Sequence, residues 1–138
     1  MIEIRNLVKY YGEILAVNNV SFTVNKGEIL GFLGPNGAGK TTTMNILTGY
    51  LSATSGSVTI NGFDILDDPQ QAKKCIGYLP ENPPLYLDMT VIEYLKFVSE
   101  LKGVPSDQRI KQMSEIMKLV RITDVAGRLI KNLSKGYR

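Results

Sequence analysis

Apolar and polar residues alternate in the first part of the chain, which is typical of β-strands with one buried face. Residues 2–7 and 20–24 show this alternation with many β-branched side chains, and Asn25-Lys26-Gly27 supplies a turn after the second segment. Residues 28–33 form a short continuous apolar run instead. Such a run predicts a strand that is buried on both faces.

Helical spacing first occurs after a glycine-rich loop. Residues 40–51 carry apolar side chains three to four positions apart and predict a helix. Residues 57–60 predict a strand that ends at the turn signal Asn61-Gly62, and residues 75–79 predict another strand. The chain therefore places a strand, a glycine loop and a helix in immediate succession over residues 28–51.

Helical patterns dominate the second half of the chain. Asp68-Pro69-Gln70-Gln71 predicts a helix start with a capping Asp and with Pro at the first helical position. Thr90-Val91-Ile92-Glu93 has the form of a capping box, and Ser106 is the predicted cap of the next helix. From this shift we expect a mixed α/β part over residues 1–84 and a helical part over residues 85–138.

Composition narrows the chemistry that this chain supports. Its 138 residues include no histidine and a single cysteine, Cys75. An imidazole metal site, a Ser-His-Asp or Cys-His catalytic device and a disulfide framework therefore lack parts. Hydrophobic residues at 43% and charged residues at 21% are typical of a packed domain, and we expect a reducing, cytosolic compartment. No signal peptide or membrane span is predicted.

The net charge of +3 is unevenly distributed along the chain. Residues 1–100 carry a net charge of −3 and residues 101–138 carry +6. The basic segment fits a solvated helical face, and it also fits a surface that meets phosphate, nucleic acid or lipid headgroups. Both interpretations stay open at this point.

The glycine-rich loop satisfies the phosphate-binding pattern G-x-x-x-x-G-K-[ST]. Glycines let successive backbone N–H groups turn toward an anion, and the positive end of the following helix adds to the attraction. The rival dinucleotide fingerprint fails because Thr42 stands at its third glycine position and no acidic residue lies between Glu28 and Asp64. The predicted nucleotide-binding residues of this loop are Gly34, Pro35, Asn36, Gly37, Ala38, Gly39, Lys40, Thr41 and Thr42.

With these motifs the chain resembles the nucleotide-binding domain of ABC-type ATPases. Tyr11, followed by Val17, is similar to the aromatic loop that stacks on adenine in that family. Glu81 stands where the family's Q-loop usually has glutamine. Leu133, Ser134, Lys135 and Gly136 resemble the signature motif LSGGQ, with Lys135 and Tyr137 as departures. The phrasing of these segments is most similar to ABC-2-type exporters and to gliding-motility-associated ABC ATPases.

The resemblance implies an α/β fold of the P-loop NTPase class with an N-terminal antiparallel β subdomain and a helical subdomain. It also implies ATP as ligand and Mg²⁺ held by Thr41 and Glu81. The signature residues would act in trans, on the nucleotide of a second ATP-binding subunit in a head-to-tail dimer. The further implied partner is an integral membrane permease. The expected location is cytoplasmic, on the inner face of the cell membrane, and no nucleic acid partner is expected.

Hydrolysis in the family requires a Walker B strand, a catalytic glutamate and a switch histidine, none of which this sequence contains. Leu85-Tyr86-Leu87-Asp88 imitates the strand, but Met89 replaces the glutamate. We therefore expect the N-terminal part of a longer ABC ATPase, truncated before the Walker B strand, with no catalytic residue of its own and no turnover. Alternatives are a soluble ABC ATPase acting on nucleic acid or ribosomes, a P-loop kinase, and a nucleotide-binding regulator without catalysis.

Overall fold

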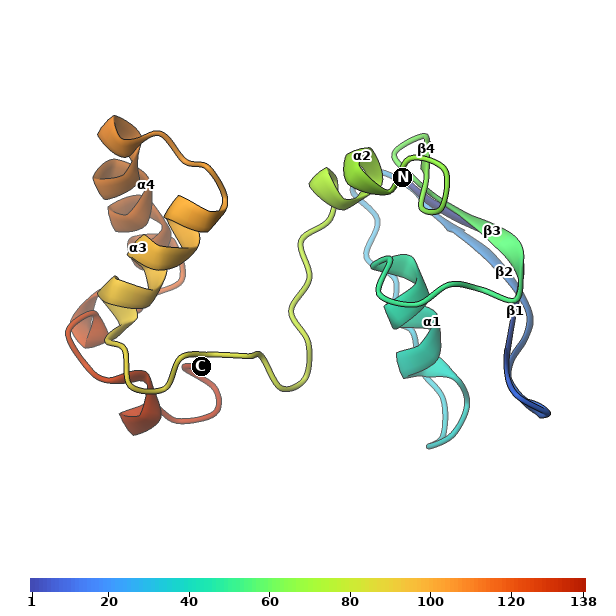
Figure 1. Ribbon diagram of the computed structural model, residues 1–138. Helices are drawn as coiled ribbons and strands as arrows, with labels where there is room; N and C mark the ends of the chain where they lie inside the picture. Colours follow the sequence, from blue (N-terminus) through green and yellow to red (C-terminus); the bar gives the residue numbers. More distant parts are fainter. The chain divides into compact units, whose positions relative to one another are not determined.

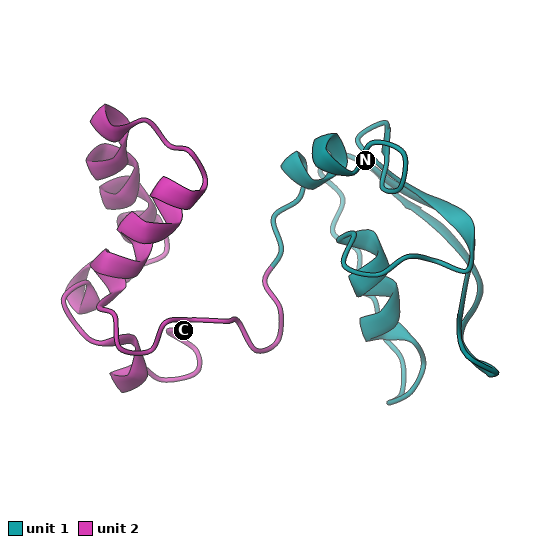
Figure 2. Ribbon diagram, in the orientation of Figure 1, with its two compact units in different colours: residues 1–78 teal, residues 79–138 magenta.

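The computed structural model describes residues 1–138, which divide into two compact units. The first unit is Met1–Tyr78 and the second is Leu79–Arg138, shown in separate colours in Figure 2. The sheet belongs to the first unit and the two longest helices belong to the second. The division between residues 84 and 85 that the sequence indicates stays a prediction.

An antiparallel sheet forms the framework of the first unit (Figure 1). Its strands lie in the order β2-β1-β3-β4. The alternating patterns extend further than predicted, because the tip of the β1–β2 hairpin is also paired. Asn61 and Gly62 both adopt positive φ and make the tight turn from β3 to β4, as their sequence indicates. The strands are β1 (Ile2–Tyr11), β2 (Ile14–Val24), β3 (Ser55–Ile60) and β4 (Phe63–Asp64).

Two helices, α1 (Lys40–Leu47) and α2 (Pro69–Lys74), lie on one side of this sheet (Figure 1). Helix α2 starts with Pro69 as predicted, but the Asp68 side chain makes no capping hydrogen bond. Aliphatic side chains from the strands and helices form one core, which anchors α1 and therefore the loop that precedes it. The buried members of this core are Ile4, Leu7, Val17, Ile46, Leu47, Val58, Ile60, Ile65 and Ala72.

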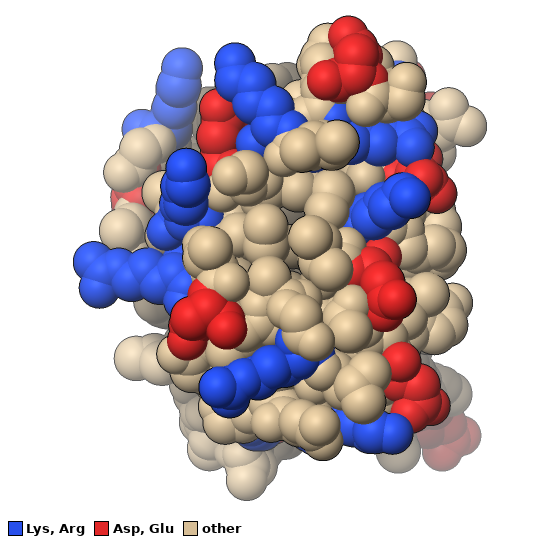
Figure 3. Space-filling view, turned by 90° about the vertical axis from the view of Figure 1, so that its left-hand side faces the viewer, with Lys and Arg blue, Asp and Glu red and all other residues tan.

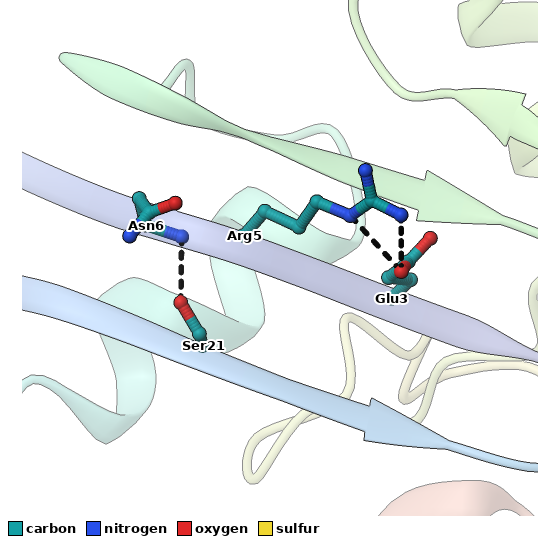
Figure 4. A network of polar contacts seen from close by, with 4 residues as sticks. All are labelled: Glu3, Arg5, Asn6 and Ser21. Atoms are coloured by element: carbon teal, nitrogen blue, oxygen red, sulfur yellow. Dashed lines mark hydrogen bonds and ion pairs between the residues drawn. The ribbon is translucent and has the colours of Figure 1, made fainter.

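A pair of asparagines interrupts the pairing of β1 with β2 between Ile4 and Leu7. Asn6 and Asn19 both have φ near 49°, and the Asn6 side-chain amide donates to Asn19 Oδ1 at 3.0 Å. The Asn6 backbone N–H donates to Ser21 Oγ at 2.7 Å, next to an ion pair between Arg5 and Glu3 (Figure 4). These polar contacts replace ladder hydrogen bonds at the irregularity.

Two predicted strands do not form. Residues 28–33 and 75–79 have no strand pairing, although both segments are rich in apolar residues. Ile29 is 98% exposed and Leu33 is 91% exposed, so the apolar run is not buried. An apolar run indicates a tendency toward burial, but a strand also requires a neighbour for its backbone hydrogen bonds, and none of the four strands pairs with these segments.

The second unit is built from α3 (Val91–Leu101), α4 (Ser106–Leu119) and the short helices η1 (Thr123–Val125) and η2 (Ile130–Asn132). The predicted capping box is confirmed, because Thr90 and Glu93 exchange hydrogen bonds at the start of α3. The predicted Ser106 cap is wrong, since Ser106 is itself the first helical residue and Pro105 precedes it as the cap position without a side-chain bond. On α4, Met113 and Met117 are buried, whereas Ile110 is 82% exposed.

Charged side chains on the visible face of the second unit are mixed in sign. In Figure 3 lysines and arginines lie among carboxylates around an uncharged centre, and they do not gather into one basic patch. Ion pairs join Arg109 to Glu100 and Lys131 to Asp88 within this unit. None of the helices combines the length and the apolar character that a bilayer-spanning segment requires.

Candidate nucleotide-binding site

The phosphate loop, residues 34–41, turns tightly into helix α1. Gly37 and Gly39 adopt φ of 82° and 80°, and Gly39 is the cap residue of α1 in a left-handed conformation. The Lys40 ammonium donates to the carbonyl oxygens of Gly34 and Pro35, each at 2.7 Å. The Lys40 side chain therefore folds back over the start of its own loop. The positive φ values of Gly37 and Gly39 make the tight turn that precedes it.

Backbone amides at the start of α1 are available for an anion. The N–H groups of Gly39, Lys40, Thr41 and Thr42 donate to no protein oxygen, as expected for the first turn of a helix. No acidic side chain lies in this turn to occupy them. Unpaired amides beside a lysine at the positive end of a helix fit the chemistry of a polyphosphate.

Thr43 anchors the loop from beneath. Its side chain is 1% exposed, and its hydroxyl donates to the Gly39 carbonyl at 3.0 Å, next to the backbone bond from Thr43 N–H to the same oxygen at 2.8 Å. The phosphate-loop pattern does not include Thr43, and its position one turn into the helix is the only signal for this role. The two bonds hold Gly39 at the cap position.

Strand β2 approaches the loop at Gly39. A Cβ atom on Gly39 would run into the Ala16 carbonyl oxygen and would lie 3.2 Å from Val17 Cγ2. The predicted site residue Val17 therefore lies against the phosphate loop. Tyr11 pairs with Ile14 at the tip of the same hairpin and is 46% exposed, with Lys9 Nζ 5.4 Å from its ring centroid.

Glu81 belongs to the second unit, whereas Thr41 belongs to the first. Glu81 is exposed and forms no ion pair. It lines an open cavity of about 560 Å³ with Lys135, Gly136 and Arg138. The joint magnesium site of Thr41 and Glu81 stays a prediction. No group of three or more acidic, histidine or cysteine side chains offers a different metal site.

The signature-like segment begins a helical turn. The Ser134 carbonyl accepts hydrogen bonds from the N–H groups of Tyr137 and Arg138, both at 3.1 Å. Ser134, Lys135 and Gly136 are all exposed, and residues 135–137 form a turn. The role of the Ser134 hydroxyl toward an anion, which the resemblance implies, stays a prediction.

Two carboxyl groups near this segment have perturbed acidity. A hydrogen bond from Lys131, together with its positive charge, lowers the pKa of Asp88 below the usual range. The backbone N–H of Thr90 and then its hydroxyl lower the pKa of Glu93. Both carboxylates are therefore ionised at neutral pH. The Asp88 carboxylate pairs with Lys131 of η2, and the Glu93 carboxylate accepts a hydrogen bond from Thr90 at the start of α3.

The pattern G-x-x-x-x-G-K-[ST] at residues 34–41, in a glycine loop with unpaired amides that leads into helix α1, is typical of P-loop nucleotide-binding domains. Comparison with known proteins narrows this class. The family model of the ABC transporter matches residues 17–138, and the chain belongs to this family. The fold expected from the sequence, an ABC ATPase nucleotide-binding domain with an antiparallel β subdomain, is confirmed.

Relatives of the chain come from archaea, bacteria and a eukaryote, Dictyostelium discoideum. It is 40% identical over 135 residues to an uncharacterized ABC transporter ATP-binding protein of Methanocaldococcus jannaschii, covering 98% of this chain and 47% of that protein. It is 35% identical to the linearmycin resistance ATP-binding protein LnrL of Bacillus subtilis, covering 100% of this chain and 44% of the relative. The chain thus spans a little under half the length of both proteins.

Solved structures agree in fold. A dimeric ATP-binding cassette in a post-hydrolysis state, bound to ADP and Pi, superposes with a TM-score of 0.81 at 27% identity. The match covers 99% of this chain and 64% of that one. Both units of the present chain therefore have counterparts in a single cassette.

Proposed function

We propose that this chain is the nucleotide-binding portion of an ATP-binding subunit that drives export through a membrane permease. The observation that carries the proposal is the set of unpaired amides of Gly39, Lys40 and Thr41 at the start of α1, next to the Lys40 ammonium. The oxygens of a triphosphate offer acceptors to these amides and negative charge to the ammonium, whereas a neutral ligand would leave the charge of Lys40 uncompensated.

In this proposal different residues contact different parts of the nucleotide. Tyr11 offers an aromatic face to adenine, and Val17 contributes apolar surface beside the loop. Lys40 binds the β- and γ-phosphate oxygens, for which it releases the carbonyls of its own loop. Thr41 and Glu81 would hold Mg²⁺, which supplies positive charge to the terminal phosphates.

The signature residues Leu133, Ser134, Lys135 and Gly136 act on the ATP of a second subunit in this proposal. The dimeric post-hydrolysis cassette supports a two-subunit arrangement. The relatives support export, since one is a linearmycin resistance protein and another, from Escherichia coli, is a probable multidrug ABC transporter ATP-binding protein. A transporter subunit of this kind lies on the cytoplasmic face of the membrane, bound to its permease.

The test is the binding of a fluorescent ATP analogue in the presence of Mg²⁺. The chain binds the analogue, and Lys40→Ala weakens binding at least about tenfold, since one charge-assisted contact to phosphate is lost. Lys26→Ala is the matched control, because Lys26 is an exposed lysine of the same unit in the turn after β2. Equal affinity of Lys40→Ala and the unchanged chain would contradict the proposal.

Hydrolysis is measured separately. The 138-residue chain is expected to show no ATP turnover. A clear hydrolysis rate of the 138-residue chain, abolished by Lys40→Ala, would show that it contains a catalytic group that the proposal does not assign.

A further inference from the structure

The chain contains two Asn-Gly pairs, and each of them forms a tight turn. They are Asn36-Gly37 in the phosphate loop and Asn61-Gly62 between β3 and β4. An asparagine before a glycine is chemically labile, because no Cβ atom shields the glycine nitrogen from the asparagine side chain. All four residues are exposed to solvent, so exposure alone does not distinguish the two pairs.

The sheet restrains the second of these pairs. The Asn61 N–H donates to the Met1 carbonyl at 2.8 Å, and the Asn61 side-chain amide lies 3.9 Å from Cys75 Sγ. Directly beside the turn, Ile60 pairs with Phe63 in the ladder of β3 with β4. An attack on the Asn61 side chain by the next nitrogen requires rotation of the peptide between them, and the paired strands oppose that rotation.

The first pair lacks such restraints. The turn of the phosphate loop is closed by a bond from Ala38 N–H to Pro35 O at 3.2 Å, which leaves the Asn36 side chain and the Gly37 N–H unbound. A Cβ atom added to Gly37 would meet no other atom within 4 Å, so the space around it is open. The Asn36 side chain can therefore rotate toward the Gly37 nitrogen.

Positive charge beside the first pair favours the same reaction. The attack places negative charge on the glycine nitrogen and then on the oxygen of the side chain. The Lys40 ammonium lies 2.7 Å from the Pro35 carbonyl oxygen, in the peptide group that joins Pro35 to Asn36. The positive end of α1 begins at Lys40 as well, and both stabilise a developing anion. The hydrogen bonds of Asn61 are with a carbonyl and a thiol, which carry no positive charge.

We propose that Asn36 is a site of spontaneous deamidation that disables the phosphate loop. The Gly37 nitrogen forms a bond to Asn36 Cγ, and the bond from Cγ to Nδ2 breaks. The side-chain nitrogen leaves as ammonia and takes the proton of the Gly37 N–H. One water molecule then opens the cyclic imide at either of its carbonyls, which leaves an α-linked or a β-linked aspartyl residue at this position.

The product changes both the charge and the shape of the loop. Its carboxyl group is ionised at neutral pH, in a stretch that otherwise has no acidic residue between Glu28 and Asp64. The new carboxylate repels phosphate and attracts the Lys40 ammonium. The β-linked product also lengthens the backbone inside a tight turn. This effect on binding rests on the proposed function, whereas the reaction itself does not.

The first experiment needs no nucleotide and uses the 138-residue chain itself. The chain is kept in mildly alkaline buffer, and peptide mass spectrometry follows the gain of about 1 Da at each Asn-Gly pair. We expect Asn36 to react at least about fivefold faster than Asn61 in the folded chain, and the two rates to agree within about twofold in guanidinium chloride. Equal rates in the folded chain would overturn the proposal, and so would a ratio that guanidinium chloride leaves unchanged.

The contribution of the lysine is measured in the same way. Lys40→Ala is expected to slow the reaction of Asn36 about threefold, because the developing anion loses its nearest cation. Lys26→Ala is the control, since it removes an exposed lysine outside the loop and should leave the rate at Asn36 unchanged. An unchanged rate in Lys40→Ala would overturn the part assigned to the ammonium.

The last experiment measures the affinity for the fluorescent ATP analogue. Asn36→Asp reproduces the α-linked product, and Asn61→Asp is the matched control in an exposed turn outside the loop. We expect Asn36→Asp to weaken binding about tenfold and Asn61→Asp to leave it unchanged. Unchanged affinity of Asn36→Asp would overturn the effect on the loop. If the unmodified chain binds no ATP while Asn36 still reacts faster than Asn61, only the proposed function is contradicted.

Discussion

Gly39 lies directly against the backbone carbonyl of Ala16, so the last glycine of the phosphate loop is seated on strand β2. This contact joins the hairpin that carries Tyr11 to the loop that carries Lys40. The distance between the two is then set by the sheet and does not depend on loop flexibility. A substitution of Gly39 therefore affects both the conformation of the loop and its contact with strand β2.

Gly39→Ala is expected to destabilise the first unit and to abolish nucleotide binding. A left-handed conformation costs an alanine about 1 to 2 kcal/mol, and the clash with Ala16 adds to this. Gly37→Ala is the control, because Gly37 has a similar φ of 82° but a Cβ atom added there would meet no other atom within 4 Å. Urea unfolding should show a larger loss in the free energy of unfolding for Gly39→Ala than for Gly37→Ala. Equal losses would show that the contact with Ala16 does not affect stability.

Thr90→Ala removes the side-chain half of the capping box at α3. The Thr90 hydroxyl accepts from Glu93 N–H at 3.3 Å, and the Thr90 N–H donates to Glu93 Oε2 at 2.8 Å. We expect a loss of about 1 kcal/mol in the free energy of unfolding, and Thr90→Ser should recover most of it. Helix content by circular dichroism and the urea midpoint are the measurements. If Thr90→Ser is no more stable than Thr90→Ala, the hydroxyl of Thr90 does not stabilise the start of α3.

Acid should weaken the second unit. The pKa values of Asp88 and Glu93 are lower in the folded protein than usual, so both groups stabilise the fold above their ordinary pKa, near pH 4. Their contribution is constant at neutral pH and is lost as the pH falls below about 4 through the folded pKa values. Asp88→Asn with Glu93→Gln should flatten the stability profile below this pH, measured by thermal unfolding from about pH 7 to about pH 2.5. If the dependence of stability on pH is the same in this double variant, other carboxylates cause the acid sensitivity.

Self-association is expected through the apolar run at residues 28–33. Ile29 and Leu33 are almost fully exposed, and adjacent exposed apolar side chains favour contacts between copies. Ile29→Ser with Leu33→Ser should shift the 138-residue chain toward monomer in size-exclusion chromatography. Leu119→Ser is the control, since Leu119 is 81% exposed on α4. If the control has the same effect, the association is not specific to this run.

Local signals predicted the elements that depend on local contacts. The Asn61-Gly62 turn, the Pro69 helix start and the Thr90–Glu93 capping box all involve residues at most three positions apart, and all three are present. The glycine positions of the phosphate loop belong to the same group, because positive φ at Gly37 and Gly39 follows from the absence of a Cβ.

Features that depend on distant partners were not predictable. The apolar pattern of residues 28–33 indicates burial but cannot say whether a neighbouring strand is present, and so the strand prediction was wrong. The ion pair between Lys131 and Asp88 joins residues 43 positions apart, and no local motif marks either residue. Ser106 is a good capping residue in isolation, but the helix begins at Ser106 itself and places its side chain past the cap position.

The hydrogen bonds from Lys40 to Gly34 and Pro35 have a consequence for how an anion enters. The lysine acts as an internal brace, which keeps the loop near its curved shape while no anion is bound. In the proposed nucleotide site, the oxygens of an arriving phosphate would replace these two carbonyl acceptors, and the chain would not have to order a free loop. Much of the entropic cost of binding would then be met during folding, and affinity would depend on how readily the ammonium leaves its own loop.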